Sequence, residues 1–125
     1  MSYAQPVADF GHGIGVDGLT LDHAGLAQLR LDAGRMLTFE ATDAALLVYL
    51  TAPAPFVELP RLLTALKAVH AREHDGPPLQ LGLRGRGNEA SLVMLTRLAG
   101  RHVGGSDIAR VVEVLLGWHA QWAAS

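Results

Sequence analysis

The fold is decided by residues 28–50, QLRLDAGRMLTFEATDAALLVYL, where three strand patterns follow one another with only short turns between them. Polar and apolar residues alternate over residues 28–32 and again over residues 36–40, as they do in strands with one buried face. Ala33-Gly34 between these stretches has the composition of a tight turn, which predicts a hairpin. Residues 45–50 are apolar throughout, which is typical of a strand covered on both faces. We therefore expect three consecutive antiparallel strands.

Helical patterns lie on both sides of these strands. A second helix is expected to open at Glu58 and Pro60 and to stop at residues 75–78, and a third to start at residues 104–107 and to carry an apolar stripe as far as Trp122. The first helix lies near the N-terminus, where four apolar residues recur at helical spacing: Tyr3, Val7, Phe10 and Ile14.

A second hairpin completes the pattern, with strands at residues 79–83 and 90–95 around a glycine-rich turn. The expected order is therefore α-β-β-β-α-β-β-α. Short turns leave no room for parallel crossovers, so we predict an α+β fold with a five-stranded antiparallel sheet and three helices. A chain of 125 residues builds one core, and we expect residues 1–125 to form a single domain.

Composition excludes several classes of function. Half of the residues are apolar, yet no run is long enough to span a membrane, and a net charge of −2 gives no attraction to nucleic acid or anionic lipid. Without cysteine there is no disulfide framework and no thiolate metal site, and no basic residue precedes Arg30 to start a secretion signal. We expect a cytoplasmic globular protein that binds neither nucleic acid nor membrane.

Two motifs point to chemistry. Residues 13–18 spell G-x-G-x-x-G, the dinucleotide fingerprint, but they follow a predicted helix instead of a strand, so we interpret them as a helix-ending loop. His70, Glu73 and His74 match H-x-x-E-H, in which two histidines hold zinc and the glutamate activates water. A small metal-dependent hydrolase is therefore the alternative function. A solvated helix end explains the same residues, because the helix dipole favours histidine there. We expect no catalytic residue, no metal and no cofactor.

Apolar residues outnumber what one small core can hide, and an apolar surface of this kind marks a protein interface. The second helix and the following strand contain a self-complementary apolar patch that is typical of a dimer interface. Its residues are Leu62, Leu63, Leu66, Val69, Leu79 and Leu81.

Three stretches in sequence resemble the opening of the class I type III secretion chaperones, the Tir chaperone (CesT-like) family. They are residues 10–16 (FGHGIGV), residues 18–25 (GLTLDHAG) and the strand pair with LRL at 29–31 and LTFE at 37–40. The pattern extends from Val7 to Trp122, where the last helix also carries Trp118.

This resemblance implies a bacterial cytoplasmic protein without catalytic activity. It would dimerise and hold the N-terminal chaperone-binding segment of a secreted effector or gatekeeper protein in an extended, export-competent form. The implied partner-binding groove is lined by Val7, Phe10, Ile14, Leu29 and Leu31, with strand addition as the second mode of contact. A homodimer is expected, and a heterodimer with a second chaperone is the other arrangement found in the family.

Overall fold

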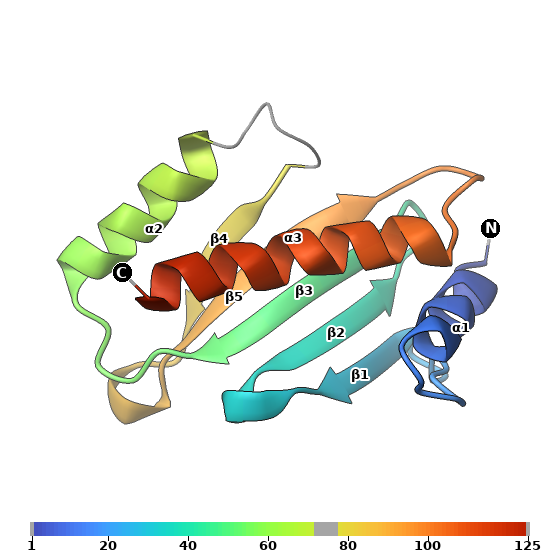
Figure 1. The fold of residues 1–125 in the computed structure, drawn as a ribbon, viewed down its shortest axis with the longest axis horizontal. Helices are drawn as coiled ribbons and strands as arrows, with labels where there is room; N and C mark the ends of the chain where they lie inside the picture. The colour runs from blue at the N-terminus through green and yellow to red at the C-terminus, as the bar shows by residue number, and fades with distance from the viewer. Residues whose placement is uncertain (1, 72–77, 125) are drawn as a thin grey trace.

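The sheet has five strands in the order β1-β2-β3-β5-β4, and every neighbouring pair is antiparallel (Figure 1). The structure is a computed structural model, and it describes residues 2–71 and 78–124. The elements in chain order are α1 (Ala4–Gly13), β1 (Leu26–Arg30), β2 (Met36–Ala41), β3 (Leu46–Pro53), α2 (Leu59–Ala71), β4 (Gln80–Arg84), β5 (Ser91–Leu98) and α3 (Gly105–Ala124). The predicted fold class and element order are confirmed.

The hairpins form where alternation predicts them. The turn between β1 and β2 is a short 3-10 segment in which Ala33 and Gly34 both take positive φ angles, 57° and 73°. β3 continues past the predicted end at Leu50 to Pro53, because β5 still pairs with it there, whereas its pairing with β2 stops at Thr51, opposite the first residue of β2.

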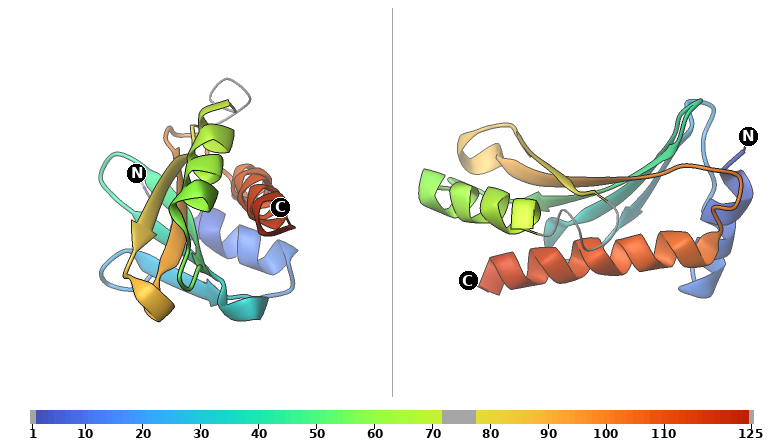
Figure 2. Two further views of the ribbon diagram at one scale, coloured as in Figure 1. Left: turned by 90° about the vertical axis from the view of Figure 1, so that its left-hand side faces the viewer. Right: turned by 90° about the horizontal axis from the view of Figure 1, so that it is seen from above.

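All three helices pack on one face of the sheet, and the opposite face carries none of the described helices (Figure 2). α3 crosses the sheet diagonally, contacts β3 and β5, and packs against α1 at one end. Leu46, Val48 and Leu50 on β3 are fully buried, but the alternating Leu47 and Tyr49 are only partly buried. The expectation that β3 is covered on both faces is therefore wrong. No described helix packs on its second face, where Leu47 and Tyr49 stay only partly buried.

One apolar core joins the helices to the sheet. Its largest fully buried side chains include Phe39, Met94 and Leu115, from β2, β5 and α3. The N-terminus of α3 is capped by Asp107, whose carboxylate accepts a hydrogen bond from the N–H of Gly104 at 2.8 Å.

Candidate functional site

The first predicted site, the groove on α1 and β1, is only partly at the surface. Val7 and Phe10 are buried in the core, and the Phe10 ring lies 5.5 Å from the Phe39 ring. In this conformation these two side chains support α1 from beneath, and their role in a partner-binding groove stays a prediction. Ile14, just after α1, is 48% exposed, and Leu29 and Leu31 are half-buried.

The exposed parts of this site are separate. α1 lies beside the end of the sheet at which β1 begins (Figure 1), whereas Leu29 and Leu31 come at the far end of β1 and just beyond it. Ile14 and Phe10 line a hollow of about 320 Å³ between α1 and the start of α3. Within residues 2–71 and 78–124, β1 is an edge strand that pairs only with β2, so one of its edges is open to a further strand.

The second predicted site, on α2 and β4, is divided between core and surface. Leu62 and Val69 pack partly against the core, together with Leu79 and Leu81 of the following strand segment. Leu63 and Leu66 are exposed instead. The innermost position of α2 is Ala65, which is fully buried, so α2 packs through residues 62, 65 and 69 and turns residues 59, 63 and 66 outward.

The outward side of α2 carries an apolar ridge that extends beyond the predicted patch. Leu59 is 66% exposed and Phe56, in the loop before α2, is 72% exposed. We define the apolar ridge as Phe56, Leu59, Leu63 and Leu66. The described residues contain six exposed large apolar side chains, and four of them form this ridge. A fifth, Leu83, lies on β4, the strand that α2 contacts.

The two additions, Leu59 and Phe56, differ in how far the sequence could have revealed them. Leu59 precedes Leu63 by four residues, so helical spacing already placed it on the ridge. Phe56 follows Pro55 in a loop, where spacing carries no signal. Its φ angle is 53°, which is rare for a bulky residue, and its N–H donates a hydrogen bond to the Gly87 carbonyl at 2.8 Å. The structure holds this aromatic side chain at the surface at a cost in backbone strain.

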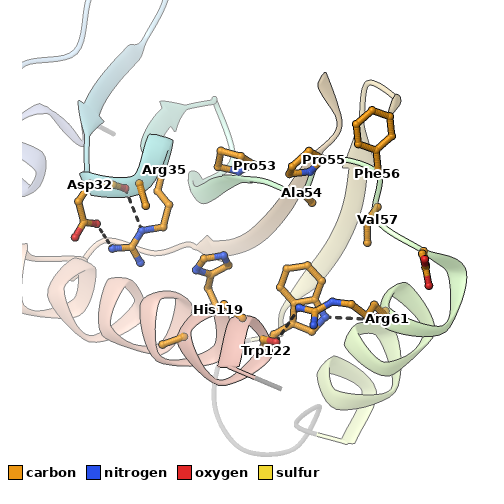
Figure 3. A pocket seen from close by; sticks show the side chains of 14 residues that line it. Asp32, Arg35, Pro53, Ala54, Pro55, Phe56, Val57, Arg61, His119 and Trp122 are labelled. Atoms are coloured by element: carbon orange, nitrogen blue, oxygen red, sulfur yellow. Dashed lines mark hydrogen bonds and ion pairs between the residues drawn. The ribbon is translucent and has the colours of Figure 1, made fainter. Parts of the chain in front are cut away.

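A groove of about 770 Å³ lies between the β1–β2 turn, the loop before α2 and the end of α3 (Figure 3). Asp32 and Arg35 form an ion pair on one wall, and the Arg35 guanidinium lowers the pKa of the Asp32 carboxyl. His119 lies across from them, and its Nδ1 is buried without a hydrogen-bond partner among the residues that the structure describes. Burial lowers the pKa of His119, and the charge of Arg35 lowers it further. On the other wall, Arg61 stacks on Trp122.

The sequence motifs with chemical precedent do not assemble a reaction centre in the described residues. Residues 13–18 follow α1 as predicted, and the Val16 N–H donates to the Gly11 carbonyl at 2.7 Å to close the helix end. His70 lies at the end of α2, while Glu73 and His74 fall outside the described residues. Across residues 2–71 and 78–124, no group of three metal-ligating side chains comes together.

Within the same ranges, no helix is both long and apolar enough to cross a lipid bilayer.

Neither a protein-family model nor a curated protein matches this sequence. Solved structures do. A chain of the HopA1–SchA chaperone–effector complex superposes with a TM-score of 0.73 at 19% identity, covering 96% of this chain and 91% of the other. A chain of the ExsC–ExsE complex gives a TM-score of 0.71 at 18% identity, covering 93% and 86%. YbjN from E. coli is less similar, with a TM-score of 0.52, 14% identity and coverage of 90% and 82%.

At these identities the comparisons establish the fold, and function has to be argued from the surfaces. The fold implied by the resemblance in sequence is confirmed over nearly the whole chain, because chains of these two complexes share it.

Proposed function

We propose that this protein is a cytoplasmic bacterial type III secretion chaperone. It dimerises and binds the N-terminal segment of a secreted effector or gatekeeper protein, which it keeps soluble and competent for export. Residues 1–125 act as one domain and have no catalytic activity. The observation that carries the proposal is the apolar ridge on α2, in a fold shared with chaperone–effector complexes.

The dimer interface is assigned to the apolar ridge together with Leu62, Val69, Leu79, Leu81 and Leu83. Burying an exposed Leu or Phe side chain contributes up to about 1.5–3 kcal/mol. Four ridge residues on each of two copies therefore supply a gain comparable with the ~4–15 kcal/mol that association costs. A two-fold axis lets the same patch face itself, so a single ridge suffices for both partners.

The effector-binding surface is assigned to the open edge of β1, with Ile14, Leu29 and Leu31 as the apolar contacts and Val7 and Phe10 beneath them. An extended segment that pairs with β1 would gain main-chain hydrogen bonds, and its alternate side chains would reach half-buried leucines. The hollow beside Ile14 offers a separate pocket for one apolar side chain farther along the segment.

The test of effector binding uses a secreted protein that co-purifies with this chain from a lysate of cells carrying a type III secretion system. Isothermal titration calorimetry with its N-terminal segment should give saturable binding. The folded C-terminal part of the same secreted protein is the matched control and should not bind. Binding of the C-terminal part alone, or of neither part, would reject the proposed function.

The test of dimerisation is Leu66→Asp. We expect the parent protein to be a dimer by light scattering and the variant to be a folded monomer, because an interfacial carboxylate without a partner costs several kcal/mol. Thr64→Asp adds the same charge to α2 away from the ridge and should remain dimeric. A dimeric Leu66→Asp protein would refute this interface, and a monomeric parent that dimerises only with a second chaperone would identify a heterodimer.

A further inference from the structure

Among the described residues, α2, which carries the apolar ridge, packs on the core through a narrow face centred on Ala65. In the described part of the chain, Ala65 is its only fully buried side chain, and its main neighbour is the edge strand β4. Figure 2 shows α2 standing at one end of the molecule, beside the C-terminal end of α3. Packing alone therefore leaves the orientation of α2 weakly determined.

Arg61 on α2 and Trp122 on α3 bind each other reciprocally (Figure 3). The Arg61 Nη2 donates a hydrogen bond to the Trp122 carbonyl at 3.1 Å, and the Trp122 Nε1 donates one to the Arg61 carbonyl at 3.2 Å. The guanidinium carbon also lies 4.5 Å from the centroid of the Trp122 ring. Three interactions thus join one turn of α2 to one turn of α3.

Each of these interactions has a physical reason to be strong. The Trp122 carbonyl is among the last four of α3, which receive no hydrogen bond from an N–H group of their own helix, so Arg61 supplies the missing donor. The guanidinium also places a positive charge at the negative end of the helix dipole. A cation over an indole face is the most favourable cation–π pair. Trp122 is itself buried and stacks on Trp118 with ring centroids 6.4 Å apart, so the contact is anchored on a rigid helix.

We propose that the Arg61–Trp122 contact is the positioning element that fixes α2 on α3 and so aligns the apolar ridge with that of a second copy of this chain. The part concerning the second copy rests on the proposed dimerisation. From Arg61 to the end of α2 the helix extends roughly 15 Å. A rotation of about 10° around Arg61 moves that end by roughly 3 Å, which exceeds the ~1 Å tolerance of apolar side-chain contacts.

The absence of cysteine allows the orientation of α2 to be measured directly. Spin labels at Ala68→Cys, which faces away from the ridge, and at Glu113→Cys on α3 report the distance between the two helices in the full-length protein. Dilution with unlabelled protein removes distances between copies. We expect one narrow distance distribution in the parent, a broad one in Arg61→Ala, and only partial rescue by Arg61→Lys, because an ammonium cannot stack as the planar guanidinium does.

Sedimentation equilibrium of the unlabelled variants then tests the consequence for dimerisation. Arg61→Ala should weaken the dimer at least tenfold, whereas Arg110→Ala, which removes an exposed arginine from α3, should change neither the dimer constant nor the distance distribution. Arg61→Met keeps a long side chain but loses the guanidinium, and with it the hydrogen bond to the Trp122 carbonyl and the cation–π contact, so it gives a second variant should Arg61→Ala fail to fold.

The outcomes separate the two proposals. A narrow, unchanged distance in a folded Arg61→Ala or Arg61→Met protein overturns the positioning role. A broadened distance with an unchanged dimer constant overturns the link to dimerisation. A monomeric parent refutes the proposed dimer and with it the alignment role, while the distances still decide whether this contact fixes α2.

Discussion

At the scale of single residues, Asp22 and Gly25 explain why the stretch LDHAG before β1 has its composition. One Asp22 carboxylate oxygen accepts hydrogen bonds from the N–H groups of Leu26 and Ala24, at 3.0 and 2.8 Å, and these bonds lower the pKa of the carboxyl. Gly25 has a φ of 79°, and a Cβ there would lie 2.9 Å from the Ala41 carbonyl oxygen. The motif therefore has a structural role: it starts β1 in register with β2.

The consequence is measurable at Gly25. Gly25→Ala should lower the free energy of unfolding by about 1–3 kcal/mol, because the left-handed backbone and the close carbonyl both oppose a side chain. Gly13→Ala is the control, since an added Cβ meets open space at the end of α1. Urea unfolding followed by circular dichroism gives both values. Equal stabilities of the two variants would contradict this account.

Near neutral pH, His119 contributes to the dependence of stability on pH. Burial and the neighbouring Arg35 lower its pKa in the folded protein, so the folded chain keeps the ring neutral at a pH where the unfolded chain, with an ordinary pKa near 6.5, is already protonated. The unfolded state therefore binds more protons as the pH falls below about 6.5, and stability declines over that window towards the lower, folded-state pKa.

Urea unfolding at about pH 7.5 and about pH 5.5 tests this effect. The loss of stability at the lower pH should shrink in His119→Gln and persist in His12→Gln, whose exposed ring pairs with Asp17 at 3.0 Å. An undiminished loss in His119→Gln would assign the effect to other groups.

At the scale of elements, sequence patterns predicted the secondary structure of each segment better than they predicted which of its faces is buried. Alternation located the hairpins, because apolar and polar residues alternate along a strand that has one buried face. On α2, Leu62 and Leu63 are neighbours of equal hydrophobicity, so the apolar stripe is wider than one packing face. The small Ala65 decides the outcome, because it lets α2 approach the core most closely, and this contact is set by tertiary structure.

The α1–β1 site shows the same limit. Helical spacing correctly grouped Val7 and Phe10, but a shared apolar face is consistent with both a groove and a core. The Phe10 ring packs against Phe39 of β2, and no local pattern encodes this contact between residues that are 29 positions apart. The exposed Phe56 is likewise set by the loop contact with Gly87, far along the chain.

At the scale of the whole molecule, the helices cover one face of the sheet and α2 stands at one end (Figure 2). The apolar ridge on α2 is exposed, so the isolated chain leaves apolar area in water. If a second copy buries that area, folding and association are coupled, and stability must depend on protein concentration by mass action. A tenfold increase in concentration then contributes about 1.4 kcal/mol per dimer at 25 °C. Differential scanning calorimetry at two concentrations tenfold apart should show the midpoint of unfolding rise for the parent and stay constant for monomeric Leu66→Asp. A parent midpoint that does not move with concentration would mean that the ridge stays exposed to water in the folded protein, and the apolar surface would then have to be covered by the secreted partner alone.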